Sequence, residues 1–379
     1  MAVAQEQTRY RPLTAAILVA AALVLSAPFV GQIRAAIRQA FPGHFVLIVG
    51  GIVAAGLCAA LAAAALRIRD RRALRYGAIL LALVVATVYS VGNAGENPDS
   101  NVVELFHFLQ YGLIAFLFYR VWRPLADRSI SLLPALAGLI VGTVEEWFQW
   151  FIPNRVGELK DIFLNLVAIG CGLLFSLAVD PPVRRFTTFP AAARRRVASV
   201  AAAALIALAA FFDVVHIGHR LTDDEIGAFT SRFSMARLGD LQQDRTAAWA
   251  RQPPPVKLVR LSREDQYLTE GIQHVRERNR LWAAADVRGA WLENRILEKY
   301  YEPVLSTPTH EGAGHKWSPE QRADANERGG VVASQAAYVS NAYPYRLYTW
   351  SRTLFWILTC TAAAMLVWYG RSATARTVD

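Results

Sequence analysis

The chain has 379 residues, of which 54% are hydrophobic and 18% are charged, and its formal net charge is +10. This composition is more apolar than that of an ordinary soluble domain, so we expect a membrane protein with the lipid bilayer as its surroundings. The 40 lysine and arginine residues are dispersed along the chain, and this dispersion excludes nucleic acid as an expected partner.

Eight apolar runs are close in length to a helix that crosses the hydrocarbon core, which needs about 20 residues. They lie at Leu13–Gln32, His44–Leu66, Ala78–Gly92, Val102–Val121, Leu132–Phe151, Asp161–Val179, Val197–His216 and Tyr348–Tyr369. The first run is not followed by a small-residue cleavage site and a polar segment, so we expect it to remain as an anchor. The sequence therefore predicts an all-α, polytopic bundle of about eight transmembrane helices.

Arginine residues gather in alternate loops, which fixes the predicted orientation. The loops after the second, fourth and sixth runs are rich in arginine, whereas the loop 93–101 contains Glu96 and Asp99 but no lysine or arginine. Short cytoplasmic loops collect lysine and arginine. We therefore expect a multi-pass protein of a bacterial-type inner (plasma) membrane with both termini in the cytoplasm.

The runs and loops divide the chain into five predicted segments. Two transmembrane helices form residues 1–77, and a core of four further spans forms residues 78–180. The seventh span and its basic cytoplasmic loop occupy 181–216, a polar extracytoplasmic domain occupies 217–347, and the last span with a cytoplasmic tail occupies 348–379.

Polar and ionisable residues lie inside or at the edges of the fourth, fifth and sixth runs, at a depth where such groups are costly and mark functional sites. Within each run they recur at helical spacing and so share one face. The set comprises Glu104, His107 and Tyr111 in the fourth run, Glu145, Glu146 and Gln149 in the fifth, Asp161 and Asn165 in the sixth, and Arg155 and Lys160 just before the sixth. Small residues on the same helices predict close helix packing, namely Gly138, Gly142, Gly170 and Gly172. Since His107, Glu146, Gln149 and Asn165 lie roughly 5–9 Å below the outer helix ends at about 1.5 Å per residue, we expect one polar pocket open to the extracytoplasmic side.

The order and spacing of this whole set resemble the VanZ-like membrane proteins. The resemblance covers about residues 78–180 and is carried by Glu104, His107 and Tyr111, by Glu145, Gln149 and Arg155, and by Asp161, Asn165, Gly170 and Gly172. The family is named for an accessory protein of glycopeptide resistance that lowers teicoplanin susceptibility. The resemblance implies a role in the cell envelope, and in antibiotic resistance, more than it implies a reaction. This chain differs from the family pattern by two extra N-terminal spans and by the polar domain.

Three functions remain open for the predicted pocket. As a binding site it would hold a lipid-linked phosphate, with Arg155 and Lys160 at the phosphate and Glu104, Tyr111, Glu145, Gln149, Asp161 and Asn165 completing the set. As an enzyme, the protein would use His107 and Glu146 for proton transfer on such a lipid. As a structural subunit, the protein would recruit partners through its polar domain, and the side chains would join the helices through the pairs Arg155–Asp161, His107–Glu145 and Gln149–Asn165. A metal held by His107, Glu146 and Asp161 has no ligand motif in its favour, so we predict no metal and no cofactor.

The adjacent Glu145 and Glu146 also resemble the start of the paired-glutamate motif of CAAX-type intramembrane proteases. That motif requires an arginine where this chain has Trp150 and a phenylalanine where it has Val103. Both departures argue against the protease.

The polar domain is predicted to be mainly helical and to offer a surface for a protein partner. We expect one helix from Thr222 to Gln252, with Thr222 as its cap, a second from about Ser262 to Tyr301, and a third that begins at the Ser318–Gln321 capping box and reaches Asn341. His310, Glu311 and His315 lack the spacing of a zinc motif and predict a loop. Cys58, Cys171 and Cys360, each inside a predicted span, are interpreted as apolar packing residues.

Overall fold

The computed structural model describes residues 2–125, 127–149, 157–182, 189–253, 266–309, 312–330, 338–343 and 346–372, with side chains from residue 12 onward. The chain forms two compact units, which are described separately below. Unit 1 comprises residues 1–149, 157–211 and 356–379, and unit 2 comprises residues 150–156 and 212–355. The site residue Arg155 lies outside the described residues.

Among the described residues, eight long apolar helices make up the membrane part of the chain, and they confirm the predicted all-α multi-pass fold. By length and composition each can cross a membrane. They are α1 (Ala2–Ala40), α2 (Phe45–Arg67), α3 (Arg72–Gly92), α4 (Pro98–Trp122), α5 (Ser129–Gln149), α6 (Leu159–Val179), α7 (Ala191–His216) and α13 (Arg352–Ser372). Their apolar residues face outward as well as inward, as expected for helices whose surroundings are lipid.

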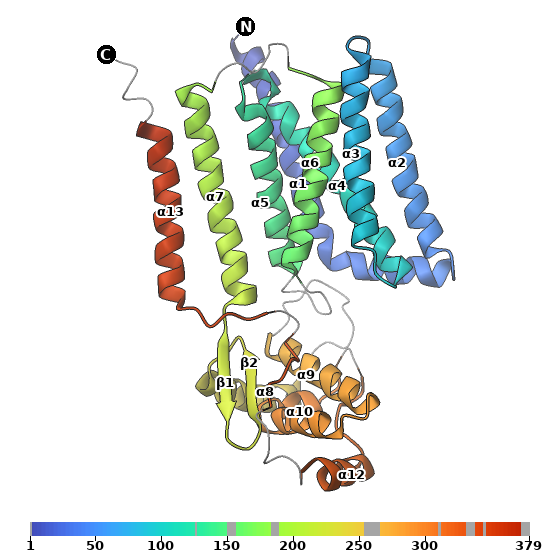
Figure 1. Cartoon of the computed structure of the whole chain (residues 1–379), viewed down its shortest axis with the longest axis vertical. Helices are drawn as coiled ribbons and strands as arrows, with labels where there is room; N and C mark the ends of the chain where they lie inside the picture. Colours follow the sequence, from blue (N-terminus) through green and yellow to red (C-terminus); the bar gives the residue numbers. More distant parts are fainter. Residues whose placement is uncertain are drawn as a thin grey trace. The chain divides into compact units, whose positions relative to one another are not determined.

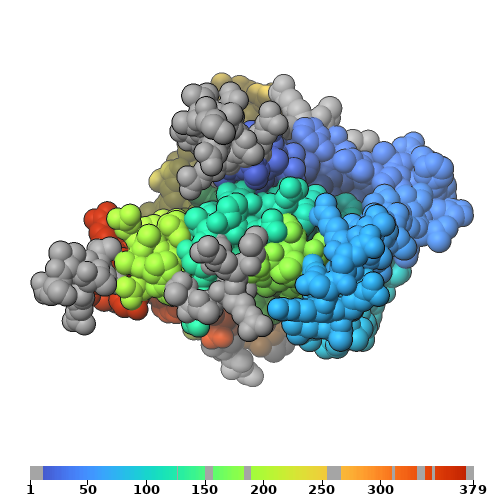
Figure 2. Space-filling model, turned by 90° about the horizontal axis from the view of Figure 1, so that it is seen from above, coloured from blue at the N-terminus to red at the C-terminus, as the bar shows by residue number. Residues whose placement is uncertain are grey.

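Helices α4 and α6 form the centre of unit 1. Helix α4 packs against α1, α2, α5 and α6, and α6 also contacts α3 and α5. Figure 2 looks along the helices from the end that carries the α2–α3 loop, with α13 and α7 at one edge of the unit and α2 and α3 at the other. Fully buried Tyr111, Tyr119 and Ile169 lie in the core of this helix cluster.

Glycines allow the central helices to approach closely. A Cβ atom on Gly172 would lie only 2.6 Å from the Cα atom of Gly112, so α4 and α6 cross there backbone to backbone. On α5, Gly138 faces Ile169 and Gly142 faces Asn165 and Tyr111. The close packing predicted from the glycines is confirmed at these positions, but the prediction is wrong for Gly170, which is exposed and has no neighbour within 4 Å.

Helix α1 is longer than the predicted span and bends. Pro28 lies inside it and removes one backbone hydrogen bond, which is the usual cause of a kink. Beyond the bend the helix turns toward the start of α2 (Figure 1). Arg38 near its end forms an ion pair of 2.5 Å with Asp99 and lies over the ring of Phe45. The last part of α1 is therefore attached to the ends of α2 and α4.

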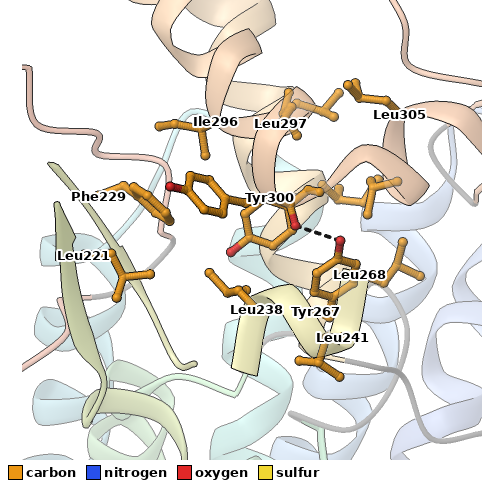
Figure 3. Close-up of a cluster of buried hydrophobic side chains, with 14 of the residues drawn as sticks. Leu221, Phe229, Leu238, Leu241, Tyr267, Leu268, Ile296, Leu297, Tyr300 and Leu305 are labelled. Atoms are coloured by element: carbon orange, nitrogen blue, oxygen red, sulfur yellow. Dashed lines mark hydrogen bonds between the residues drawn. The ribbon is translucent and has the colours of Figure 1, made fainter. Parts of the chain in front are cut away.

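In its described residues, the 212–355 segment of unit 2 begins with a β-hairpin and continues as five helices. The antiparallel strands are β1 (His219–Asp223) and β2 (Gly227–Ser231), and the helices are α8 (Met235–Arg251), α9 (Gln266–Ala283), α10 (Val287–Tyr300), α11 (Glu302–Ser306) and α12 (Pro319–Gly330). Figure 3 shows that Leu221 and Phe229 of the hairpin share one core with Leu238, Tyr267 and Ile296 of the helices. In this core the Tyr267 hydroxyl donates to the carbonyl oxygen of Tyr300 at 2.8 Å.

The first and last segments of unit 2 are hydrogen-bonded to each other. Ile217 and Tyr348 form a parallel β-bridge. The backbone N–H of Tyr348 donates to the carbonyl of His216 at 2.7 Å, and that of Gly218 donates to the carbonyl of Tyr348 at 3.1 Å. The 212–355 segment of unit 2 therefore begins and ends at one place.

The predicted helix from Thr222 to Gln252 is wrong at its start. The carboxylate of Asp223 accepts the backbone N–H groups of Glu225 and Ile226, and Gly227 has a φ of +102°, so this segment turns into a hairpin. The helix begins later, at α8, where Ser234 is the cap.

The two remaining helix predictions are correct in part. The stretch predicted from Ser262 to Tyr301 is divided between α9 and α10 at Ala285, whose φ is +62°, and Asp286 caps α10. The capping box at Ser318 is confirmed by reciprocal hydrogen bonds with Gln321 of 3.2 and 3.3 Å. Helix α12 is described as far as Gly330, and it does not reach Asn341, because Val339 pairs with Ala228 in a β-bridge.

Acid should weaken unit 2 through Asp223. Burial alone would raise the pKa of Asp223, but hydrogen bonds from Lys299 and Tyr300 outweigh burial and lower it to about 2. Because the folded pKa lies below the unfolded value of about 3.9, this group stabilises the fold above about pH 4, by about 1–2 kcal/mol, and the contribution is lost as the pH falls toward 2. We expect Asp223→Asn to lower the unfolding free energy of the full chain at pH 6 and to change little at pH 2. An equal loss at both pH values in thermal unfolding would contradict this assignment.

Candidate functional site

Polar side chains from three helices meet at one end of the bundle, where α4 begins, α5 ends and α6 begins. His107 Nδ1 lies 2.9 Å from Asn165 Oδ1, which joins α4 to α6. The Tyr111 hydroxyl donates to Glu145 Oε2 at 2.7 Å, which joins α4 to α5. We call this group the polar cluster; it comprises Glu104, His107, Tyr111, Glu145, Glu146, Gln149, Glu158, Lys160, Asp161 and Asn165.

Two adjacent carboxyl groups lie at the buried centre of the polar cluster. Glu145 and Glu146 are 6% and 0% exposed, and Gln149 Nε2 donates to both, at 2.8 and 3.1 Å. The second oxygen of Glu145 accepts from Tyr111, and that of Glu146 accepts the backbone N–H of Glu158 at 3.2 Å. Every carboxyl oxygen of the pair therefore has a donor, as buried acidic groups require.

Asn165 provides an amide nitrogen that is not used. Its side chain is 1% exposed, and its Nδ2 atom has no hydrogen-bond partner among the residues that the structure describes. A buried donor without an acceptor is costly, by about 1–3 kcal/mol. Next to it His107 is half-buried, and its ring stacks on that of Tyr111 at 6.2 Å between centroids. Asn165 can thus donate to a ligand that enters beside His107.

Charged groups form the rim of the polar cluster, where Lys160 is exposed and the acidic groups are half-buried. Lys160 Nζ lies 3.3 Å from Glu104 Oε1, and Asp161 interacts electrostatically with His107, Lys160 and Glu104. Glu158, the residue before α6, is half-buried, and this burial together with the neighbouring Asp161 raises the pKa of its carboxyl group. The rim therefore carries more acidic groups than basic ones.

The structure brings together the predicted residues that it describes, but it pairs them differently. His107 bonds to Asn165 and not to Glu145, and Gln149 bonds to the two glutamates and not to Asn165. The predicted pair of Arg155 and Asp161 is not described, because Arg155 lies outside the described residues. In the described part of the chain, no three histidine, cysteine, aspartate or glutamate side chains are grouped so that they could hold a metal.

One member of the cluster was not anticipated from the sequence. Glu158 precedes α6 and contributes its backbone N–H to Glu146. Its position in a short loop next to Lys160 and Asp161 was only a weak signal, because a hydrogen bond from a backbone N–H does not depend on the residue type.

No protein-family model, curated protein or solved structure matches this chain. The site must therefore be interpreted from its own chemistry. The VanZ-like resemblance stays a prediction, which rests on the residues that carry it.

Removing the Glu145 carboxyl should destabilise the bundle. In Glu145→Ala, the Tyr111 hydroxyl and the Gln149 amide would lose a buried acceptor, with an expected cost of about 2–3 kcal/mol. Glu145→Gln keeps one acceptor oxygen and should cost less. Thermal unfolding in detergent would measure both, with Glu104→Gln at the rim as the control. Its ion pair with exposed Lys160 is expected to contribute less than about 1 kcal/mol. A loss in Glu104→Gln as large as that in Glu145→Ala would contradict the role of burial.

Proposed function

We propose that this protein is a VanZ-like binding protein of the cell envelope, set in the plasma membrane with both termini in the cytoplasm. Its polar cluster would face the extracytoplasmic side and bind the head group of a lipid-linked envelope precursor. The observation that carries the proposal is the convergence of polar groups from α4, α5 and α6, one of which, Asn165 Nδ2, is a buried donor without an acceptor. Polar groups at membrane depth are retained where they serve a ligand or a pathway.

The balance of charge favours a ligand group that is positively charged. The described cluster contains five carboxyl groups and two basic side chains; the acids are Glu104, Glu145, Glu146, Glu158 and Asp161, and the bases are His107 and Lys160. An excess of acidic groups attracts an amine and repels a phosphate. A phosphate at this site would depend on Arg155, since Lys160 is already paired with Glu104. We therefore propose an amine-bearing head group, with a hydrogen-bond acceptor near Asn165.

Binding without turnover is the function that the described contacts support. His107 and Glu146 were the predicted catalytic residues, but each is bonded to a different partner, Asn165 for the first and Gln149 with Glu158 for the second. General acid/base catalysis needs both groups within hydrogen-bond reach of one substrate position. The hydrogen bonds among the described residues do not bring these two side chains to one such position, so the proposal includes no reaction.

Native mass spectrometry tests this function directly. Protein purified from its own membrane in mild detergent should carry a bound molecule, and fragmentation should show an amine in its head group. The double variant Glu104→Gln, Asp161→Asn and the single variant Asn165→Ala should each lose it, whereas Glu96→Gln should retain it. Glu96 is an exposed residue in the loop before α4, at the same end of the bundle. A folded wild type without any bound molecule, or equal retention in all variants, would overturn the proposal.

A further inference from the structure

A second candidate site, separate from the polar cluster, lies between α2, α3, α4 and α6. The helices line a partly open cavity of about 480 Å³, within the range of about 300–1,000 Å³ found for ligand sites. Its walls are almost wholly apolar and include Leu57, Ala82, Ala86, Leu109 and Phe175. Such apolar walls favour binding of a hydrocarbon chain over binding of a polar ligand.

The cavity is long and follows the helix axes. Along α2 its lining runs from Val53 to Arg67, which is about 21 Å at about 1.5 Å per residue. Half of a hydrocarbon core about 30 Å thick is about 15 Å, so the cavity is long enough for an acyl chain of one leaflet. Small side chains keep it open, since Gly56, Ala60 and Ala63 line it on α2 alone.

One end of the cavity is positively charged. Arg67 is part of the lining, Arg69 and Arg71 follow in the short α2–α3 loop, and Arg72 is the first residue of α3. All four are exposed, and in the described part of the chain none of them forms an ion pair. The neighbouring Asp70 is paired with Arg75. Unpaired arginines at the end of an apolar cleft between transmembrane helices fit an anionic lipid head group.

We propose that this cavity binds one anionic phospholipid from the surrounding bilayer. An acyl chain would lie between α2, α3, α4 and α6, and the phosphate would bind Arg67 with the arginines of the α2–α3 loop. This inference does not depend on the function proposed for the polar cluster, because the two sites share no residue. Figure 2 shows the end of the bundle at which the head group would lie, next to α2 and α3.

Native mass spectrometry with defined lipids tests the proposal. Delipidated full-length protein would be mixed with equal amounts of phosphatidylglycerol and phosphatidylcholine that have the same acyl chains. The wild type should retain one phosphatidylglycerol in preference to phosphatidylcholine. Arg67→Gln with Arg69→Gln should reduce this preference by about fivefold for each arginine removed. The control is Arg195→Gln at the start of α7, an exposed arginine at the same end of the bundle, and it should keep the preference.

A second variant tests the cavity itself. Ala86→Phe places a large side chain in the lining and should reduce retention of both lipids, whereas Leu80→Phe, at an exposed position of α3 outside the lining, should not. Circular dichroism would establish that each variant remains helical. Equal retention of the two lipids by the wild type would overturn the proposal, as would an Arg67→Gln, Arg69→Gln double variant that behaves like Arg195→Gln. Unchanged lipid retention in folded Ala86→Phe would show that the acyl chain lies elsewhere and would also overturn it.

Discussion

Replacing Gly172 with leucine should lower the stability of the membrane bundle by about 3 kcal/mol or more. The new Cβ atom alone would meet the Cα atom of Gly112 at 2.6 Å and its carbonyl oxygen at 2.7 Å. Both atoms belong to the backbone of α4, so the clash cannot be relieved by a side-chain rotation, and the two central helices must separate. We expect a lower thermal unfolding temperature in detergent and weaker protection of α4 and α6 in hydrogen exchange.

The same helix offers a matched control two residues away. Gly170 is exposed, and a side chain there would meet nothing within 4 Å. Gly170→Leu makes the same chemical change in the same helix and should alter the unfolding free energy by no more than about 0.5 kcal/mol. Similar losses in the two variants would mean that any side chain added to α6 destabilises the bundle, and that the crossing of α4 and α6 does not set the cost.

Glu270→Ala should have the largest effect in unit 2, about 3–5 kcal/mol. Glu270 is 3% exposed and accepts three hydrogen bonds, from the Ser231 hydroxyl at 2.6 Å, the Arg232 backbone N–H at 2.8 Å and the Tyr301 hydroxyl at 2.8 Å. Burial raises the pKa of Glu270, while these three bonds act to lower it. Without the carboxyl group, the Ser231 hydroxyl, the Arg232 backbone N–H and the Tyr301 hydroxyl would have no acceptor.

Tryptophan fluorescence during thermal unfolding of the full chain would measure this loss. Glu277→Ala serves as the control, since Glu277 lies on the same helix and its partner Arg280 is largely exposed. An ion pair with one solvent-exposed member should contribute less than about 1 kcal/mol. Equal destabilisation by the two variants would show that α9 responds to any loss of a glutamate, and the buried network would then not explain the result.

The membrane helices could be predicted from sequence because their signal is the length of an apolar run. No tertiary contact is needed to recognise a segment such as Phe45–Arg67, which begins and ends within one residue of the predicted run. The polar residues of the site were found by the same logic, since an ionisable group in such a run is conspicuous. Their partners were not predictable. His107 bonds to Asn165 and not to Glu145 because the rotation of each helix about its axis depends on packing, which residue spacing alone does not define.

In unit 2 the local signals were ambiguous. Asp223 has the same chemistry at a helix cap and in a turn, since in both its carboxylate accepts nearby backbone N–H groups. The core decides between them, because pairing of β1 with β2 buries Phe229 completely. The capping box of Ser318 and Gln321 was predictable, since both of its hydrogen bonds lie within four residues.

The bridge between Ile217 and Tyr348 has a consequence for the modular construction of this chain. An insertion whose two ends are held together replaces, in effect, a short turn between α7 and α13, so its length adds little loop-closure entropy to the membrane bundle. A domain of quite different size can be inserted between α7 and α13, or this one can be removed, without changing how these two helices pack. The 131 residues between Ile217 and Leu347 can thus vary independently of the eight helices that anchor them.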